Sequence, residues 1–222
     1  MCRKRFVEIT SKNMFIVIDG IDGSWKTTQI QRVRLALEAK WKTVKLYNFP
    51  QYGKSSAYFV EKYLAWEYGN NLDPKLSSLF YALDRFDGKK NLEDDIKNFD
   101  YILSDRYVSA NMIHQGGKIE DKKSRDDFFE WIDNLEHHIC QIPKPDRVLF
   151  LHVSPKMSEQ LVEKRWDKKD IHEQDSNHTQ NAYASALSLS SLYDNWTEIS
   201  CENKGGMKSK EEITEMILNE IL

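Results

Sequence analysis

A run of small and polar residues with one lysine and two threonines directly follows the first apolar segment of the chain. Its residues are Gly20, Ile21, Asp22, Gly23, Ser24, Trp25, Lys26, Thr27 and Thr28. At Gly20, Lys26 and Thr27 the run meets the phosphate-loop pattern G-x-x-x-x-G-K-[ST], in which backbone N–H groups surround phosphate oxygens at the start of a helix. Lys26 would reach the β- and γ-phosphates of ATP, and the Thr27 hydroxyl would ligate Mg²⁺. The alternative, a plain strand–turn–helix with a chance Lys-Thr, is disfavoured by the preceding strand and by Gly23.

The second glycine of this pattern is replaced by Trp25. A Cβ atom, and even more an indole, is poorly tolerated where the backbone approaches a phosphate or takes a positive φ. As printed, the loop is therefore damaged. One alternative follows, a catalytically impaired nucleotide-binding or scaffold protein whose indole fills the phosphate cradle.

An acidic and a basic residue, Asp105 and Arg106, follow the apolar run 101–103. In a doubly wound sheet, ligands bind outside the carboxyl ends of the strands, so we expect Asp105 beside the phosphate loop, as a ligand of Mg²⁺ or of its waters. Arg106 could hold an acceptor phosphate through two N–H groups. An isolated Asp-Arg pair is usually a salt bridge, but its place beside the loop favours a functional role.

Short apolar runs alternate with longer amphipathic segments along the chain. The strand-like runs lie at 15–18, 43–46, 101–103, 148–151 and, more weakly, 196–200, and apolar helical faces lie at 30–37, 128–139 and 213–221. This order predicts an α/β fold with five parallel strands in a doubly wound sheet, flanked by helices on both faces. We expect a single domain over residues 1–222, with an exposed polar excursion at 164–180.

The composition excludes several other classes of protein. The 222 residues include 32 basic and 35 acidic side chains, a net charge of −3, which argues against a dedicated duplex-DNA binder. The three cysteines have the spacing of neither a disulfide framework nor a zinc site. No apolar run approaches the roughly 20 residues of a membrane span, and no secretory signal pattern is present. We expect a cytoplasmic protein that binds neither nucleic acid nor membranes.

Together these residues resemble the thymidylate kinases, P-loop nucleoside monophosphate kinases that transfer the γ-phosphoryl group of ATP to dTMP. The resemblance rests on FIVIDGIDGS-KTT at 15–28, FPQYGKSSAYFVEKYL at 49–64, LFYALDR at 79–85, SDRYVSANMIHQGG at 104–117, KR-DKKDIHE at 164–173 and W-x-x-I-x-C at 196–201. Several motifs in one order are more specific than a phosphate loop alone. They imply a P-loop NTPase-type fold with a short lid at about 164–176, Mg·ATP as phosphoryl donor, and a homodimer.

The resemblance implies a set of residues that hold dTMP. They are Asp22, Phe49, Tyr52, Tyr81, Arg85, Arg106, Asn111 and Gln115. Asp22 would receive the sugar 3′-hydroxyl and Arg106 the phosphate, while Phe49 and Tyr52 would touch base, sugar or phosphate. Tyr81 would stack on thymine, Arg85 would reach a thymine carbonyl, and Asn111 and Gln115 would read the base edge.

Two alternatives remain in this base site. A shift of one residue would make Phe80 the stacking ring and Tyr81 a core residue. Asp84 and Arg85 could also form a mere surface pair on a helix. In addition, Gln51 stands where the family frequently has an arginine, which removes one possible phosphate contact.

The resemblance also implies the catalytic group. Lys26, Arg106 and Arg165 would supply positive charge, and Asp22 and Asp105 would arrange the metal and the acceptor. Arg165 lies in the lid, and the loop has Gly23 and Ser24 where one branch of the family has its own arginine. Arg165, helped by Lys164, Lys168 or Lys169, would therefore stabilise the transferring phosphoryl group.

Four of the six tryptophans stand at positions that suit glycine. These are Trp25 in the loop, Trp41 where a helix needs a left-handed cap, and Trp66 and the lid residue Trp166, which fall where the thymidylate kinases commonly have glycine. Replacing all four would raise the glycine count from 9 to 13, about the usual share. Our hypothesis is that UGA codons read as glycine in the source organism were translated as tryptophan, against the alternative of genuine substitutions.

The implied function is the phosphorylation of dTMP to dTDP by direct in-line transfer from Mg·ATP, a step of dTTP synthesis. Catalysis would consist of positioning and charge neutralisation. Besides the impaired binding protein, the remaining alternative is a kinase for another deoxynucleoside monophosphate such as dUMP.

Overall fold

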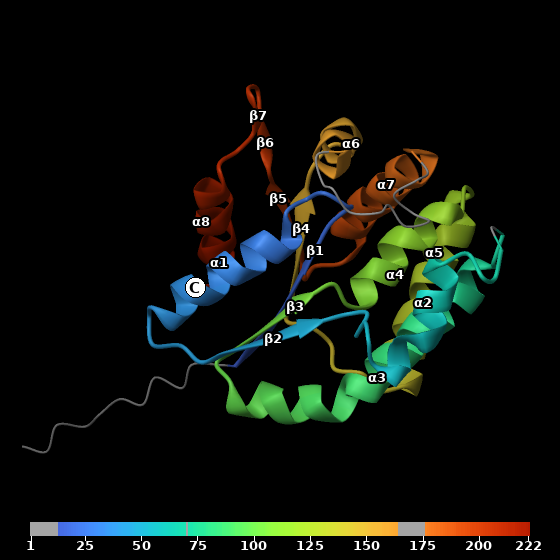
Figure 1. Ribbon diagram of the computed structural model, residues 1–222, viewed down its shortest axis with the longest axis horizontal. Coiled ribbons are helices and arrows are strands. Elements are labelled where there is room, and N and C mark those ends of the chain that lie inside the picture. Colours follow the sequence, from blue (N-terminus) through green and yellow to red (C-terminus); the bar gives the residue numbers. More distant parts are fainter. Residues whose placement is uncertain (1–12, 70, 164–175) are drawn as a thin grey trace, which may run out of the picture.

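The structure is a computed structural model that describes residues 13–69, 71–163 and 176–222 (Figure 1). Its centre is a five-stranded parallel sheet in the order β2-β3-β1-β4-β5. The strands are β1 (Met14–Asp19), β2 (Val44–Asn48), β3 (Tyr101–Asp105), β4 (Arg147–His152) and β5 (Trp196–Ser200). The five predicted strands and the α/β fold class are thus confirmed.

Helices cover both faces of this sheet, because alternate strand residues point to opposite sides. Phe15 and Val17 of β1 belong to a core shared with α3 (Pro74–Asn98), α4 (Val108–His114), α5 (Lys122–Asp133) and α7 (Ser176–Leu192). Ile16 and Ile18 belong to the opposite core, shared with α1 (Lys26–Glu38) and α8 (Lys210–Ile221). Figure 1 shows α1 and α8 together on one side of the sheet and the other group across it. Two apolar layers therefore sandwich β1.

Shorter elements complete the described part of the chain. They are η1 (Ser55–Ala57), α2 (Tyr58–Leu64), η2 (Gly116–Lys118), η3 (Asn134–Ile139), α6 (Pro155–Glu163) and the antiparallel pair β6 (Glu202–Asn203) and β7 (Gly206–Met207). Among the described residues, no helix is long and apolar enough to cross a membrane.

One predicted helical face ends early. Phe128 and Ile132 are buried as expected, but Ile139 is 67% exposed. The reason is that α5 passes into η3, a π-helical segment in which the N–H of Cys140 donates to the carbonyl of Leu135, five residues back. The wider turn takes Ile139 off the apolar stripe that an α-helical period of 3.6 predicts.

The sheet order puts the carboxyl ends of β1 and β3 side by side. Ile18 is paired with Asp105 in the parallel register, so the loop after β1 and the residues after β3 leave the sheet at the same edge. Crevices of this kind are where doubly wound sheets bind ligands. The predicted lid falls between α6 and α7, and its residues 164–175 lie outside the described residues.

Candidate active site

The loop between β1 and α1 is folded around the Lys26 ammonium group. Lys26 Nζ donates to the carbonyl oxygens of Gly20 and Ile21, each at 3.0 Å. Burial lowers the pKa of Lys26, and the nearby positive charge of Arg106 lowers it further, while Asp22 opposes the shift. A phosphate would relieve this environment, because it brings negative charge and new acceptors.

Glycine is required at one point of the loop by space as well as conformation. Gly23 has a φ of 77°, and a Cβ there would lie 2.9 Å from the carbonyl oxygen of Ser158 in α6. Ser158 also donates from Oγ to the carbonyl of Asp22 at 2.6 Å. The loop is thus held closely against the helix that leads to the predicted lid.

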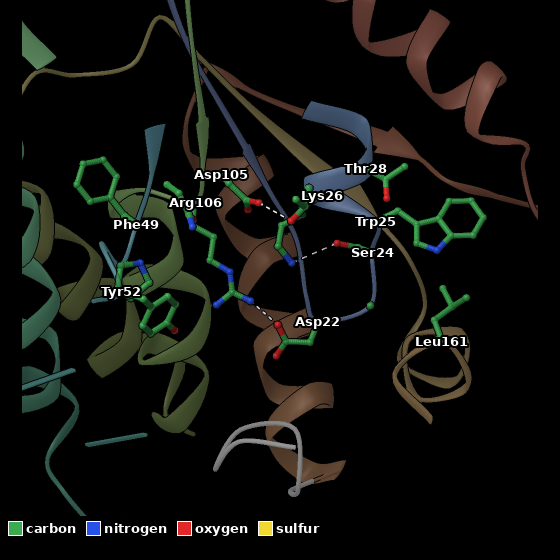
Figure 2. Close-up of a pocket in the computed structure, with 14 residues that line it drawn as sticks. Asp22, Ser24, Trp25, Lys26, Thr28, Phe49, Tyr52, Asp105, Arg106 and Leu161 are labelled. Atoms are coloured by element: carbon green, nitrogen blue, oxygen red, sulfur yellow. Dashed lines mark hydrogen bonds and ion pairs between the residues drawn. The ribbon is translucent and has the colours of Figure 1, made fainter. Parts of the chain in front are cut away.

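Trp25 occupies the left-handed conformation predicted for a glycine. It caps α1 with φ 61° and ψ 21° and makes no side-chain capping hydrogen bond. Its indole is directed away from Asp22 and Arg106 (Figure 2), and Lys210 Nζ lies 5.3 Å from the ring centroid. The structure therefore gives no support to the interpretation that the indole fills the phosphate cradle, and the strain is in the backbone.

Two further tryptophans have the same backbone conformation. Trp41 and Trp66 have φ values of 60° and 67°, and Trp41 is 95% exposed. By contrast, Trp196 is a buried core residue and Trp131 packs against the core, as predicted for those two. Left-handed conformations are uncommon for residues with a Cβ. The left-handed backbone at Trp25, Trp41 and Trp66 therefore agrees with the prediction that these three positions suit glycine. Trp166 lies outside the described residues.

The end of β3 supplies two side chains to the loop. Thr27 donates from Oγ1 to Asp105 Oδ2 at 2.7 Å, and Arg106 forms an ion pair through Nη2 with Asp22 Oδ1. Burial alone would lower the pKa of Arg106, but Asp22 and the neighbouring carboxylates raise it above its usual value, so the guanidinium stays charged. The four predicted residues Asp22, Thr27, Asp105 and Arg106 are therefore brought together.

These groups line one cavity of about 450 Å³. Phe49 and Tyr52 form the wall opposite the loop, and Leu161 of α6 closes one side (Figure 2). Pro50 also lines the cavity. Phe49 is buried between Tyr47 and Tyr107, whereas Tyr52 is exposed beside the cavity. Phe49 is thus a rigid wall, and Tyr52 offers a hydroxyl and a ring to an incoming ligand.

Asp19 is a buried carboxylate at the site that the sequence prediction missed. Its Oδ1 accepts from the backbone N–H of Gly20 at 2.8 Å, and its Oδ2 accepts from Ser109 Oγ at 2.5 Å. Burial raises its pKa, although Arg106 and Lys26 oppose the shift. An aspartate at the end of an apolar strand, directly before the loop, was the available signal.

A second cluster of predicted residues lies between α3 and α4. Tyr81 contacts Tyr63 edge to face, with ring centroids 6.3 Å apart. Phe80 instead stacks on Phe59 of α2 at 5.6 Å and packs against Tyr68. Both rings therefore contact α2, because Tyr63 lies in that helix and also packs against Phe80 at 6.5 Å.

Asp84 and Arg85 are not a surface pair. Their exposed fractions are 1% and 2%, and Arg85 binds Glu136 in η3 through Nε and Nη2. Asp84 accepts from the backbone N–H of Gln51 at 2.8 Å and from Ser56 Oγ at 2.6 Å. Gln51, placed where an arginine is frequent, fixes the loop after β2 to α3 through this carboxylate.

Asn111 and Gln115 are also buried, at 2% and 1% exposure. Asn111 Nδ2 donates to the Ser78 carbonyl and to Glu136, and Gln115 Oε1 accepts from Ser77 Oγ at 2.8 Å. Glu136 was missed in the sequence, where it is one carboxylate in an amphipathic segment with no motif around it. The predicted catalytic residues Asp22, Lys26, Asp105 and Arg106 all line the cavity, and Arg165 lies outside the described residues.

Comparisons with known proteins place the chain in one family. The family model described as "Thymidylate kinase" matches residues 18–213. A thymidylate kinase of Prochlorococcus marinus (strain AS9601) is 33% identical over 160 residues, which cover 66% of this chain and 69% of that protein. A thymidylate kinase of Mycobacterium tuberculosis (strain H37Rv) is 26% identical over 147 residues, 65% of this chain and 68% of that protein. The solved thymidylate kinase of Candida albicans has the same fold, with a TM-score of 0.75 at 18% identity over 95% of this chain and 91% of that one.

Proposed function

Because this chain belongs to the thymidylate kinase family and phosphorylates dTMP with ATP, we propose a division of roles among the residues described above. The observation that carries the proposal is the convergence of Lys26, Asp105 and Arg106 on one cavity at the carboxyl ends of β1 and β3. The family likeness gives no support to a catalytically impaired protein or to another acceptor nucleotide.

The loop 20–28 holds the phosphates of ATP. Residues 26–28 form the first turn of α1, whose N–H groups have no carbonyl partner within the helix and carry the positive end of the helix dipole. Lys26 moves from the carbonyls of Gly20 and Ile21 to the β- and γ-phosphates.

Thr27 and Asp105 hold Mg²⁺. Their oxygens are 2.7 Å apart in a part of the cavity that also faces Lys26, and a hydroxyl and a carboxylate are ligand types that Mg²⁺ prefers. The donor set therefore fits the ion. When bound, Mg²⁺ neutralises phosphate charge. Asp19 does not bind the ion; it is a buried hydrogen-bond acceptor that holds the backbone of Gly20 and the hydroxyl of Ser109 in place.

The acceptor dTMP lies between the two clusters. Arg106 turns from Asp22 to grip the monophosphate, which frees the Asp22 carboxylate for the sugar 3′-hydroxyl. Tyr81 stacks on the thymine, while Arg85, Asn111 and Gln115 face its edge. Phe49 and Tyr52 form the wall along the sugar and phosphate.

Arg165 of the lid completes the positive charge around the transferring phosphoryl group, and lid closure keeps water out.

The loop works best with glycine at position 25. The left-handed conformation of Trp25, Trp41 and Trp66 supports the hypothesis that the gene encodes glycine at all three through reassigned UGA codons. The gene sequence decides this, because UGG at any of the three positions contradicts the hypothesis.

The enzyme acts as a homodimer through α2 and α3. Phe59, Leu83 and Phe86 are 46%, 55% and 51% exposed and line one shallow groove. Apolar side chains grouped in this way on a surface mark an interaction site. Sedimentation of the chain and of Leu83→Glu tests this, since the variant is expected to be monomeric, and a monomeric parent chain would contradict the dimer.

The deciding experiment is a coupled ADP-release assay with dTMP, ATP and Mg²⁺ on the chain as printed and on Trp25→Gly. We expect turnover in the glycine form at a rate at least ten times that of the printed chain, because its loop reaches the phosphate-binding conformation without strain. Trp25→Ala is the matched control, since it removes the indole but keeps the Cβ. Absence of dTMP-dependent turnover in a folded glycine form would overturn the proposal.

A further inference from the structure

A single buried carboxylate, Glu136, holds two of the residues assigned to the base edge. Arg85 donates to it from Nε at 2.5 Å and from Nη2 at 2.6 Å, and Asn111 donates from Nδ2 at 3.0 Å. Glu136 is 0% exposed, and both donors are 2% exposed. The three side chains come from η3, α3 and α4, so Glu136 joins elements that are distant in sequence.

The contacts of Glu136 determine which N–H groups of Arg85 remain for a ligand. Arginine offers five N–H donors. Glu136 takes two, and the carbonyl of Tyr107 takes a third from Nη1 at 3.1 Å. Within the described residues this leaves one N–H on each Nη nitrogen, so Arg85 presents donors only.

The same carboxylate fixes which way the Asn111 amide is turned. Asn111 Nδ2 donates to Glu136 and to the carbonyl of Ser78 at 3.2 Å. Both partners are acceptors, so exchanging the nitrogen and the oxygen of the amide would set oxygen against oxygen twice. The amide therefore keeps its Oδ1, an acceptor, for other groups.

We propose that Glu136 is a positioning residue that sets the hydrogen-bond polarity of the base site. Through it, Arg85 offers donors and Asn111 offers an acceptor, which matches a pyrimidine with a carbonyl next to a ring N–H. Cytosine has an amino group and an unprotonated ring nitrogen at these places and opposes both. The site then takes thymine or uracil and rejects cytosine. This inference rests on the base-edge roles proposed above for Arg85 and Asn111.

The test is equilibrium binding of dTMP, dUMP and dCMP to the full chain and to Glu136→Gln by calorimetry. Binding is measured without turnover, so the readout does not depend on phosphoryl transfer at the loop. We expect the parent chain to bind dTMP and dUMP about 100-fold or more tightly than dCMP, because a built hydrogen-bond pair rejects a mismatched edge strongly. In Glu136→Gln one acceptor can become a donor, so the Asn111 amide keeps only the Ser78 carbonyl to fix its orientation, and the preference for dTMP over dCMP falls below about tenfold.

Two further variants separate positioning from folding. Glu130→Gln changes an exposed glutamate of α5 and is expected to leave all three affinities unchanged. The double variant Arg85→Met/Glu136→Leu removes both members of the buried ion pair, which avoids an uncompensated charge in the interior. It keeps a cooperative thermal transition and ATP binding, but loses the preference for dTMP over dCMP.

The outcomes are distinct. A folded Glu136→Gln that is less stable but keeps the dTMP-to-dCMP ratio within twofold of the parent overturns the positioning role, as does a double variant with the parent's selectivity. A parent chain that binds ATP but none of the three monophosphates overturns the proposed function instead.

Discussion

The hydroxyl of Thr27 donates to the Oδ2 of Asp105 at 2.7 Å, although the two residues are 78 positions apart in the sequence. This bond joins the first turn of α1 to the last residue of β3, and it places a hydroxyl and a carboxylate oxygen together beside the loop between β1 and α1. The parallel pairing of β1 with β3 brings them into reach.

Removal of the Thr27 hydroxyl should therefore affect the metal. We expect Thr27→Ala, in the Trp25→Gly background, to lower kcat on the order of 100-fold, the scale of losing one aligned charge-stabilising group. The Mg²⁺ concentration for half-maximal rate should rise as well. Thr27→Ser keeps the hydroxyl and should stay within a few-fold of the parent, and an equal loss in both variants would point to packing.

Replacement of Arg106 by lysine tests the phosphate grip. Lysine keeps the charge but lacks the planar pair of N–H groups, so Arg106→Lys should raise the KM for dTMP about tenfold or more, with the KM for ATP little changed. Steady-state kinetics with each substrate varied separately measures this. Equal increases in both KM values would mean that Arg106 serves the donor side.

The exposed Trp41 offers a measure of backbone strain alone. Trp41→Gly should stabilise the fold by about 1 kcal/mol, because a residue with a Cβ in the left-handed region costs this much relative to glycine. For a chain of this size that corresponds to a rise in Tm of roughly 2–4 °C. The kinetic constants should not change, and Trp41→Ala, which keeps the Cβ, should show no such gain.

A pH effect is expected at Lys118. Burial lowers the pKa of Lys118 to about 8, whereas an unfolded lysine has a pKa of about 10.4. Between these values the unfolded chain binds a proton that the folded chain has released, so the free energy of unfolding should rise with pH in this window.

Lys118→Met should remove this rise and leave the chain more stable at pH 7, as measured by urea unfolding from pH 7 to 10. Lys123→Met, at an exposed position of α5, is the control and should follow the parent chain. An unchanged slope in Lys118→Met would contradict a perturbed Lys118.

The local parts of the site could be predicted from the sequence. The phosphate loop and the Asp105-Arg106 pair are contiguous motifs at strand ends, and for parallel strands the topology then determines that they meet. The left-handed backbone at Trp25 and Trp41 was also predictable, because phosphate loops and helix caps require it at fixed positions, whereas the glycine-like position of Trp66 was implied by the family resemblance.

The base site was predictable only through family likeness, and only in part. Glu136 has no motif around it, and its burial depends on α3 and α4 arriving from other parts of the chain. The π-helical turn at η3, which exposes Ile139, breaks the α-helical period on which the sequence prediction relied. Asp19 was missed for a similar reason, since its partners Gly20 and Ser109 meet only in the folded sheet.

Arg106 has a φ of 63°, a conformation that favours glycine. In a regular strand Asp105 and Arg106 would point to opposite sides, but the left-handed turn at Arg106 brings both to the same cavity. A non-glycine residue held in this conformation costs about 1–3 kcal/mol, so conformational preference and chemical need are opposed at this position. Variant libraries sorted for thermal stability alone would accumulate glycine or asparagine at position 106. Libraries sorted in cells whose growth depends on this enzyme to make dTDP would retain arginine.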